Sequence, residues 1–529
     1  MKENQFTLDI QPLGVEIAAY EGDSLYTVLL VNKLLPEGGD AVRLERGVVT
    51  AALDPAHEAE CFSQAQLADG WMLASERRIS GDAEFFISDT PEPFDAPNPE
   101  QLSVAAKPQG LGLAIDLGSG LIVGGVAELS GMTIASYSGV DNSQCQLLGD
   151  LGPRIRADQD NLAQTQALLW TDIASLVQRL SSKSGFDAEQ ISTMLMTSNT
   201  LLEKVLWAAD AESGAQANWS ECKEKQIADT PLAELLPPET KLIMLPSIAS
   251  GLGSDLVAGI LASNLDQRVD EEGLTLLLDL GLNSEIVIAG RGRLLAASVS
   301  TAPLEGVGLS SGMRAKTGAI VRVRLEDDVW LTTVRDAKPA GICGAGLISA
   351  AHTLLEEGLL TEDGRILLPE EPSPELAAHF TNVVGGVEFV LSARKDQQDI
   401  AVDQNDIRQL QMAKASVYAA CMAVLAELEA EPADIEQILI AESYLNNIDP
   451  AAVLGLGFIP PIGLERVQSL GNVSWQGAYL CLGNRALLEH AQQIAQLAEA
   501  LDLATNLVYA EEFLGAMNFP EPAEDEDWV

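Results

Sequence analysis

The chain has 529 residues, a length at which one hydrophobic core rarely suffices, so two or more domains are expected. Lys and Arg total 31 against 78 Asp and Glu, which leaves a formal net charge of −47 at pH 7. A surface that negative repels phosphate backbones and anionic lipid heads, which argues against nucleic acid and membrane surfaces as partners.

The cysteine pattern points to a reducing compartment. Six cysteines are scattered singly along the chain, and no Cys-x-x-Cys pair occurs. A disulfide framework is therefore not expected in so long a chain. The first residues, MKENQFTLDIQP, lack the apolar segment of a secretory signal, and charged residues interrupt every apolar run well short of membrane-spanning length. The sequence thus predicts a cytoplasmic protein of several domains.

The N-terminal part, residues 1–89, is predicted to form a small domain of strands with one helix. Phe6, Leu8 and Ile10 alternate with polar residues, which is typical of a half-buried strand. The apolar stretch 24–35 predicts the helix. Further strands are expected at 48–53 and 84–87.

Proline marks the boundary after this domain. Residues 90–109 fall in a stretch, 88–109, that has five prolines and no periodicity, which predicts an extended linker. The last segment, 512–529, carries the run PEPAEDEDWV, whose acidity predicts a disordered tail.

The long middle portion contains an internal repeat. LAIDLGSGLIVGGV (113–126) and LLLDLGLNSEIVIAG (276–290) each read as an apolar strand ending in Asp-Leu-Gly, a short turn and a second apolar strand. Each copy continues with a third strand, an amphipathic helix and a fourth strand, expected at 132–137, 168–180 and 191–197 and again at 293–299, 410–428 and 435–441. These elements in matched order predict two related α/β lobes, 110–245 and 246–511, whose turns face a common cleft.

The paired turns are the first candidate ligand site. They run from Asp116 to Gly120 and from Asp279 to Asn283. Glycine leaves backbone N–H groups bare for phosphate oxygens, and a carboxylate at a strand end can hold Mg²⁺ through water. An ordinary β-hairpin with Asp as turn former explains either copy alone. Two copies at equivalent places favour a nucleotide-type cleft, with Asp116 and Asp279 as the metal-facing carboxylates.

Three further glycine-bearing segments are candidates for the same cleft. SGLGSD (250–255) opens a helix whose N-terminus favours anions, although Asp255 is equally well explained as an N-cap. PLEGVG (303–308) and GICGAG (341–346) have the same character. Beside the catalytic candidates Asp116, Asp279 and Glu305, the candidate binding residues are Gly118, Ser119, Gly120, Gly251, Gly253, Gly281, Asn283, Gly306, Gly344 and Gly346.

These residues resemble a known superfamily. The duplicated pattern with paired Asp-x-Gly turns is similar to the acetate kinase, sugar kinase, Hsp70 and actin (ASKHA) superfamily. More specifically, strings through nearly all of 110–510 resemble, in order, the reductive activators of corrinoid proteins. These strings are GLGLAIDLGSG (110–120), LPSIASGLGSDLVAG (245–259), LLLDLGLNSEIVIAGRGRLLA (276–296), APLEGVGLSSGMRAKTGAI (302–320), GICGAGLISA (341–350) and LGNVSWQGAYL (470–480).

The resemblance implies a plant-type [2Fe–2S] domain followed by an ATPase made of two ASKHA lobes. Such activators bind a corrinoid protein, such as a cobalamin-dependent methyltransferase, whose cobalt has been oxidised to Co(II). ATP hydrolysis then supports the uphill electron transfer that restores Co(I). The resemblance thus implies Mg-ATP as cofactor, a corrinoid-binding protein as partner, no tightly bound cobalamin of the chain's own, and a homodimer.

Residues 1–89 depart from the family pattern where the cluster is held. A [2Fe–2S] cluster needs four thiolates. The segment PEGGDAVRLERG (36–47), where the resemblance places the cysteine loop, has none; Ser75 stands where the last cysteine would lie, and Cys61 is the only thiol in the domain. We therefore expect a degenerate β-grasp, ferredoxin-like domain without a cluster, retained as a docking module, and electrons from an external donor.

The nucleotide loops depart from the family pattern as well. Ser119 is the only hydroxyl in the first turn, and Leu282 stands in the second turn where a threonine is usual. Lost hydroxyls remove hydrogen bonds to phosphate oxygens and weaken binding. The adenosine-side segment reads AESYLN (441–446), whose side chains would crowd a nucleoside and whose Glu442 would repel phosphate. These changes predict weaker binding of ATP and leave its hydrolysis open.

Three functions remain open on this pattern. The first is a divergent activator that binds a corrinoid methyltransferase and assists ATP-linked reduction of Co(II) to Co(I). The second is a pseudo-ATPase that recognises or assembles a corrinoid enzyme without hydrolysis. The third, a small-molecule kinase of the wider superfamily, is disfavoured because the specific strings match activators.

The missing thiols give a direct test. Purified protein is expected to contain no iron or acid-labile sulfide and to lack the visible absorbance of a [2Fe–2S] cluster, because one cysteine cannot ligate it. Iron analysis and a visible spectrum measure this. A brown protein with stoichiometric iron would overturn the interpretation of residues 1–89.

Overall fold

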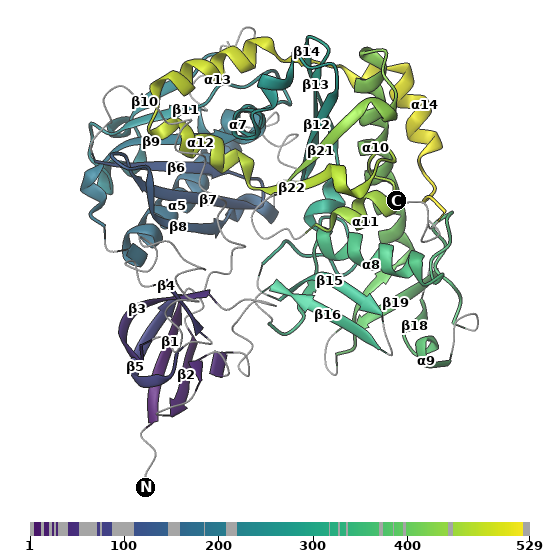
Figure 1. The fold of residues 1–529 in the computed structure, drawn as a ribbon, viewed down its shortest axis with the longest axis horizontal. Coiled ribbons are helices and arrows are strands. Elements are labelled where there is room, and N and C mark those ends of the chain that lie inside the picture. Colours follow the sequence, from purple (N-terminus) through teal and green to yellow (C-terminus); the bar gives the residue numbers. More distant parts are fainter. Residues whose placement is uncertain are drawn as a thin grey trace. The chain divides into compact units, whose positions relative to one another are not determined.

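The structure is a computed structural model (Figure 1). It describes residues 5–11, 15–20, 24–25, 28–29, 41–51, 71–74, 77–86, 110–146, 159–184, 186–207, 219–316, 318–325, 328–334, 337–369, 374–383, 386–394, 398–442 and 448–521. The chain forms two compact units, namely 1–96 with 333–338 and 97–332 with 339–529. None of the helices in the described part of the chain combines the length and the apolarity that a membrane crossing requires.

The N-terminal unit is built on one five-stranded sheet. Its strands lie in the order β2-β1-β5-β3-β4, with the bounds Val15–Tyr20, Gln5–Gln11, Ile79–Phe86, Ala41–Val49 and Trp71–Leu73. β1 runs parallel to β5, whereas the other neighbours are antiparallel. Leu8, Leu25 and Phe85 lie fully buried in its core. The predicted strand at 6–10 and the apolar stretch at 24–35 therefore both supply core residues.

Part of the segment where the resemblance places a cysteine loop is regular strand. Residues 41–47 belong to β3, which pairs with β4 on one side and β5 on the other. The strand thus begins well before the one predicted at 48–53. Cys61, Ser75 and the predicted linker 90–109 lie outside the described residues.

The second unit contains two six-stranded sheets, of which the first has the order β10-β11-β9-β6-β7-β8. Its strands are Lys223–Gln226, Lys241–Met244, Ile191–Ser198, Leu111–Leu117, Leu121–Glu128 and Thr133–Asp141. β6, β7 and β8 form an antiparallel meander, β9 runs parallel to β6, and β11 runs parallel to β9. Helix α5 (Gln159–Ser184) packs against β7 and β8.

The second sheet repeats this arrangement in the order β22-β21-β12-β13-β14-β23. Its strands are Val467–Gly471, Ile435–Glu442, Leu274–Leu280, Asn283–Gly290, Arg293–Ser300 and Glu499–Ala500. β12, β13 and β14 form the meander, β21 runs parallel to β12, and β22 runs parallel to β21. Helix α10 (Gln404–Glu427) packs against β13 and β14. The predicted duplication and α/β class are confirmed.

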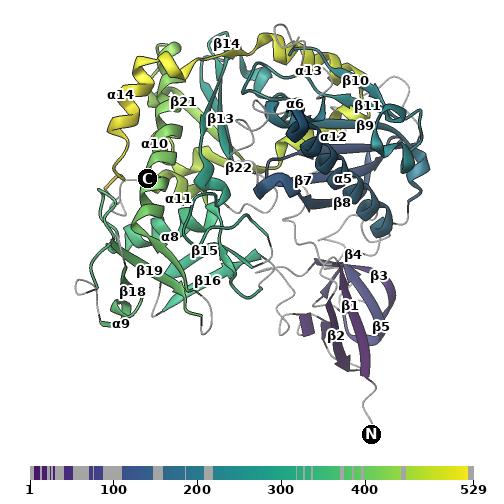
Figure 2. The same ribbon diagram turned by 180° about the vertical axis from the view of Figure 1, so that it is seen from behind.

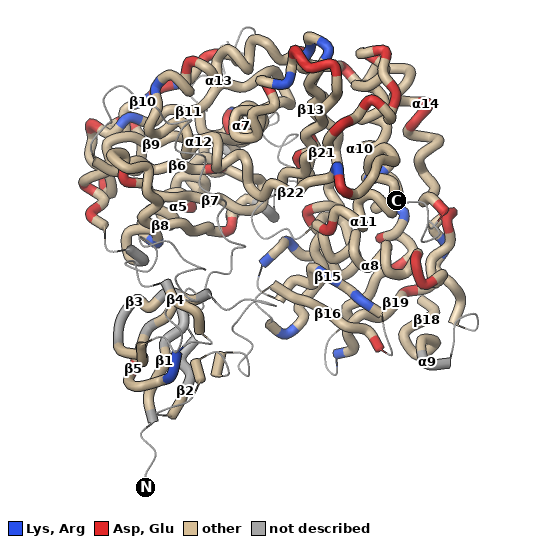
Figure 3. The backbone as a smooth tube through the Cα atoms, viewed as in Figure 1, with Lys and Arg blue, Asp and Glu red and all other residues tan. Residues whose placement is uncertain are grey.

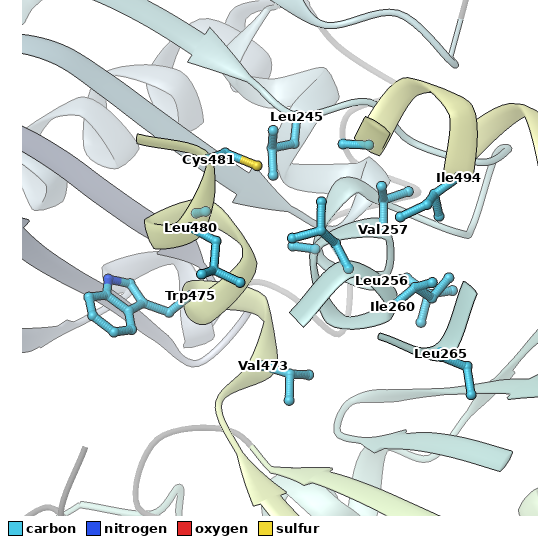
Figure 4. Close-up of a cluster of buried hydrophobic side chains, with 14 of the residues drawn as sticks. Leu245, Leu256, Val257, Ile260, Leu265, Val473, Trp475, Leu480, Cys481 and Ile494 are labelled. Atoms are coloured by element: carbon cyan, nitrogen blue, oxygen red, sulfur yellow. The ribbon is translucent and has the colours of Figure 1, made fainter. Parts of the chain in front are cut away.

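A layer of two helices lies between the sheets (Figure 4). α7 (Ser254–Ser263) and α12 (Val473–Leu482) pack on each other. The hydrophobic cluster around them takes Ala114 from β6 and Leu277 from β12, both fully buried. Because one core joins both sheets to the two helices, the lobes share their apolar burial rather than folding around separate cores.

The chain crosses back to the first sheet near its C-terminus. β22 ends at Gly471 in the second sheet, and α12 then packs on β6 and β9 of the first. Helix α13 (Arg485–Leu497) follows and packs on α7 and α12. The lobe boundary predicted at 245/246 follows chain order, whereas packing places 473–497 with the first sheet.

Most of the remaining elements belong to the second lobe, where they lie near α10 in both views (Figures 1 and 2). They are α6 (Thr200–Leu206) in the first lobe, and β15 (Ala319–Leu325), β16 (Val329–Thr333), β17 (Gly341–Ile342), α8 (Gly344–Glu356), α9 (Pro374–Ala377), β18 (Phe380–Val383), β19 (Gly386–Ser392), β20 (Ile400–Asp403), α11 (Pro450–Gly455) and α14 (Leu507–Gly515) in the second. β15 packs on α8, and α14 packs on α10.

The contact between α12 and the first sheet can be tested at Gly125. A Cβ atom there would lie 2.4 Å from the Trp475 ring. Gly125→Val is therefore expected to push the ring away from β7 and to lower the free energy of unfolding by about 1–3 kcal/mol, because overpacking strains a filled core. Urea denaturation followed by tryptophan fluorescence measures this change.

Gly515→Ala is the matched control. This glycine ends α14, is exposed, and a Cβ atom there would meet nothing within 4 Å. Its stability is expected to stay within about 0.5 kcal/mol of the parent protein. Parent-like stability of Gly125→Val would show that α12 does not press on the first sheet.

Candidate functional site

A cleft opens in the second unit where the turns of the two meanders meet. It encloses about 1130 Å³ of unoccupied space, including the part open to solvent. The residues that line it come from both sheets and from the helices between them. They are Asp116, Gly118, Ser119, Gly120, Leu121, Val123, Asp141, Asn199, Leu201, Asp255, Asp279, Gly281, Leu282, Asn283, Glu285, Glu305, Arg314, Ala315, Ala441, Asn472, Val473 and Ser474.

Glu305 marks the point where both turns converge. It ends a 3-10 helix, Ala302–Glu305, that follows β14. A Cβ atom added to Gly120 of the first turn would lie 2.8 Å from Glu305 Oε2, and one added to Gly281 of the second would lie 3.7 Å from Glu305 Oε1. The two turns therefore face each other across a single carboxylate.

The carboxylate of Asp116, near the end of β6, is held from two sides. Asn472 Nδ2 donates to Asp116 Oδ2 at 3.0 Å, and Thr197 Oγ1 donates to Oδ1 at 3.4 Å. Asn472 is also the N-cap of α12, where its Oδ1 accepts from Trp475 N at 2.8 Å. Capping satisfies an N–H group that the helix leaves unpaired. The same cap thus fixes the start of α12 and orients the cleft carboxylate.

The first turn is fixed by close packing and by Asn142. Asn142 Nδ2 donates to Gly118 O at 3.1 Å, and Asn142 N donates to Gly120 O at 3.1 Å. A Cβ atom at Gly118 would lie 2.5 Å from Leu121 O. A residue with a side chain would therefore force this turn open, which explains the glycine between the two strands.

The second turn is fixed by hydroxyl groups at the end of β14. Thr301 Oγ1 donates to Gly281 O at 2.8 Å and lies 2.6 Å from Ser284 Oγ. Thr301 N donates to Leu282 O at 2.9 Å. Leu282 itself lines the cleft, so this turn offers backbone groups and an apolar side chain to a ligand.

The second hairpin brings an additional carboxylate into the cleft. Asp279 on β12 lies opposite Glu285 on β13 in the strand register, so both side chains share one face. Glu285 Oε1 accepts from Ser298 Oγ at 3.2 Å. The equivalent pair in the first hairpin is Asp116 and Val123. The acidic character of the cleft therefore comes more from the second lobe than from the first.

One ion pair lies among these acids. Arg314 Nη1 donates to Glu305 Oε2 at 2.8 Å. The Arg314 side chain is 17% exposed and that of Glu305 is 12% exposed. Among the described residues that line the cleft, Arg314 is the single basic side chain, whereas six are acidic. The cleft therefore attracts cations.

Burial raises the pKa of both aspartates in the turns, and repulsion adds to this effect at Asp279. Burial raises the pKa of Asp116 to about 6, against the opposing effect of its hydrogen bonds from Asn472 and Thr197. Burial, followed by repulsion from Asp116 and Glu305, raises the pKa of Asp279 to about 7. Both carboxyl groups therefore titrate near neutral pH, where a bound cation would favour their charged forms.

Three further carboxyl groups are affected in the same direction. Burial, and then repulsion from the two turn aspartates, raises the pKa of Asp255 to about 8. Burial, and then repulsion from Asp255 and Asp279, raises the pKa of Glu285 well above its ordinary value. Burial raises the pKa of Glu305, although Arg314 opposes this. Acidic residues also spread over the outer helices and loops of this unit (Figure 3).

The donor set suits a hard cation held through water. Mg²⁺ prefers oxygen ligands and keeps several of its waters. Within the described ranges, no group of three or more His, Cys, Asp or Glu side chains lies close enough together to hold a metal directly. Asp116 and Asp279 are therefore not part of a closed metal cage among the described residues, and their water-mediated role stays a prediction.

The structure brings most of the predicted site residues together in the cleft, whereas the rest do not line it. Those that line the cleft are Asp116, Gly118, Ser119, Gly120, Asp279, Gly281, Asn283 and Glu305. Those that do not are Gly251, Gly253, Gly306, Gly344 and Gly346. Most of the latter serve close backbone packing: a Cβ atom at Gly306 would lie 2.1 Å from Met313 O, and one at Gly344 would lie 1.9 Å from Leu304 O.

Four cleft residues, Asp255, Glu285, Arg314 and Asn472, were not predicted as site residues. Asp255 does not cap α7; Gly253 is the N-cap, and Asp255 lines the cleft. Part of the signal for Glu285 was present in the sequence, because the predicted hairpin pairs the strand that carries Glu285 with the strand that carries Asp279. The adenosine-side residues 443–446 lie outside the described residues, as does the side chain of Glu442.

Two family models match the chain. The RACo middle region matches residues 111–268, and the C-terminal domain of RACo, the ASKHA domain, matches residues 273–527. Together these matches take in both sheets and the cleft between them.

Sequence relatives and a solved structure agree with these matches. Corrinoid activation enzyme RamQ of Eubacterium limosum is 26% identical over 417 residues, which cover 76% of this chain and 69% of the relative. The [Co(II) methylated amine-specific corrinoid protein] reductase of Methanosarcina barkeri is 25% identical over 305 residues, which cover 53% of this chain and 52% of the relative. The solved structure of a reductive activator for corrinoid, iron–sulfur protein is similar with a TM-score of 0.68 at 21% identity, covering 98% of each chain.

The raised pKa of Asp255 gives a pH-dependent test. Its pKa of about 8 in the folded protein lies above the unfolded value of about 3.9. Between these values the folded state binds more protons than the unfolded state, so this group's contribution to stability falls as pH rises. Asp255→Asn removes this fall in stability, so the substitution is expected to stabilise the protein more at pH 8 than at pH 5.5.

Urea denaturation of the metal-free protein at the two pH values measures this difference. Glu234→Gln is the control, because Glu234 is exposed and does not line the cleft, and its effect is expected to stay within about 0.5 kcal/mol. Equal stabilisation of Asp255→Asn at both pH values would contradict the assignment of a raised pKa to Asp255.

Proposed function

The chain belongs to the RACo family of reductive activators of corrinoid proteins, and we propose that it is a divergent activator of this kind. It binds a cobalamin-dependent methyltransferase or similar corrinoid protein and assists the ATP-linked reduction of Co(II) to Co(I) with electrons from an external donor. The observation that carries the proposal is the pair of turns, Asp116 to Gly120 and Asp279 to Asn283, that converge on Glu305.

In this proposal, different cleft residues bind the phosphates and the Mg²⁺ of Mg-ATP. Backbone N–H groups of both turns and the Ser119 hydroxyl bind phosphate oxygens. Asp116 and Asp279 hold Mg²⁺ through water. Bound Mg²⁺ supplies the positive charge that offsets repulsion between the phosphates and the surrounding carboxylates. Asn472 keeps the Asp116 carboxylate in place through its hydrogen bond of 3.0 Å.

The names of the relatives support a corrinoid protein as partner. One relative is named a corrinoid activation enzyme, and the other is named a reductase of a Co(II) corrinoid protein specific for methylated amines. Reduction of Co(II) to Co(I) takes one electron, and the corrinoid belongs to the partner rather than to this chain. The cluster-free N-terminal unit serves as a docking module in this proposal, so a separate reductase donates the electron.

A specific observation favours a second candidate, a pseudo-ATPase that recognises a corrinoid enzyme without hydrolysis. Leu282 lines the cleft in the second turn, where it offers no hydrogen bond to a phosphate oxygen. Without a cation, the carboxylates of this cleft also repel a triphosphate. The two candidates differ in whether Mg-ATP binds and turns over.

Turnover of Mg-ATP decides between these functions. The full chain is expected to hydrolyse ATP, and to do so faster with a Co(II) corrinoid protein present. Asp116→Ala and Asp279→Asn are each expected to lower turnover by about 100-fold or more, because loss of a charge that anchors Mg²⁺ costs several kcal/mol of transition-state stabilisation. A phosphate-release assay measures this, with Co(I) absorbance as the second readout.

Asp434→Asn is the matched control. Asp434 is half-exposed, pairs with Arg291 at 3.0 Å and does not line the cleft, so turnover is expected to stay at the parent level. Turnover that persists in Asp116→Ala would show that the site is assigned wrongly. Failure of the parent protein to bind Mg-ATP at millimolar concentration, with retained binding of the corrinoid protein, would establish the pseudo-ATPase instead.

A further inference from the structure

Arg314 stands apart from the other cleft residues by its charge and by its origin. It lies on the segment between the 3-10 helix that ends at Glu305 and strand β15 of the second lobe. The residue before it is anchored, because Met313 N donates to Ile342 O of β17 at 2.8 Å. The backbone that carries Arg314 is thus fixed to a sheet rather than to a free loop.

The guanidinium reaches from the second lobe onto the turn of the first. A Cβ atom at Gly120 would lie 2.3 Å from Arg314 Nη1 and 3.3 Å from its Cδ. The Arg314 side chain therefore fills the place where a side chain at position 120 would stand. Glycine in the first turn is needed for this approach as well as for the turn itself.

The two ends of the guanidinium have different surroundings. Arg314 Nη1 donates to Glu305 Oε2, whereas Nη2 is buried and has no hydrogen-bond partner among the described residues. A buried donor of a charged group without a partner is costly, and native proteins rarely leave one. An acceptor supplied by a ligand would satisfy it. The planar fork of arginine suits one carboxylate and one phosphate at the same time.

We propose that Arg314 binds the terminal phosphate of the nucleoside triphosphate, with Glu305 holding the other end of its guanidinium. This inference rests on the proposed function. Both side chains are deep in the cleft, so they meet the innermost phosphate of a ligand that enters with its phosphates first. Glu305 then has one oxygen committed to the ion pair.

The charge balance of the cleft supports the same role. Arg314 is its single basic side chain, against six acidic ones. Electrostatic attraction in a buried site exceeds that at a surface, because the local dielectric is lower. A fixed positive charge next to both turns is therefore the strongest protein-borne attraction available to a phosphate group. Mg²⁺, held on the carboxylates, acts from the other side.

In the opposite role, the ion pair between Arg314 and Glu305 would block phosphate binding. An ion pair between the two turns would then exclude phosphate, and its removal would strengthen binding. The two roles predict changes of opposite sign, so a binding measurement separates them.

The test is isothermal calorimetry of the full chain with Mg-ATP and with Mg-ADP. Arg314→Gln is expected to weaken Mg-ATP binding by about 10–100-fold, the range for loss of a charged hydrogen bond. It is expected to weaken Mg-ADP binding by less than about 3-fold, because ADP lacks the terminal phosphate. Arg293→Gln is the control: it breaks the ion pair with Glu499 at 2.8 Å on β14, away from the cleft, and both dissociation constants are expected to stay unchanged.

Arg314→Lys guards against a folding defect, and thermal melting is recorded for each variant. Lysine keeps the charge and the contact with Glu305 but lacks the second arm of the fork. It is expected to weaken Mg-ATP binding by about 3–10-fold and to leave Mg-ADP binding unchanged.

Each other result overturns the inference. Parent-like or tighter Mg-ATP binding in a folded Arg314 variant would do so and leave the proposed function standing. Equal losses for ATP and ADP would do the same, because they would indicate general damage to the cleft. No Mg-ATP binding by the parent protein would remove the proposed ATP-linked function and this inference together.

Discussion

Repulsion among carboxylates around one guanidinium is the constraint on which the cleft depends. The fold forces Asp116 and Asp279 toward each other because each closes the first strand of a meander, and the two meanders meet at Glu305. Burial raises the pKa of Asp116 to about 6, and burial followed by repulsion from Asp116 and Glu305 raises the pKa of Asp279 to about 7. Arg314 and an incoming cation are the groups that relieve this repulsion. Binding of a cation therefore favours the charged carboxylates and stabilises the folded protein.

The apolar layer between the sheets offsets the cost of bringing these carboxylates together. α7 and α12 share one hydrophobic cluster with both sheets. Burial of that cluster is the dominant favourable term in folding, and it outweighs the repulsion at the mouth of the same interface. Trp475 illustrates the arrangement, since its ring packs on Gly125 while its Nε1 donates to Ala114 O at 3.1 Å. The site thus sits at the polar edge of the core that holds the lobes together.

Much of the fold was predictable because it is periodic. Two copies of the same strand, turn and helix order gave both meanders and both helices, and the Asp-x-Gly turns gave the centre of the site. Arg314 and Asn472 were not predictable from spacing. Asn472 reaches Asp116 from 356 positions along the chain, and Arg314 lies on a segment without periodicity. Several predicted glycines, such as Gly306 and Gly344, do not line the cleft but allow close backbone packing, because that packing and phosphate binding select the same residue.

The junction between β22 and α12 has a mechanical consequence. Gly471, at a φ of 69°, ends a strand of one sheet, and Asn472 begins a helix that packs on the other. A hinge motion between the sheets would change the geometry of this junction. Since Asn472 also donates a hydrogen bond to Asp116, such a motion would displace the carboxylate that faces the ligand. Ligand binding in the cleft and the position of the C-terminal helices are therefore coupled.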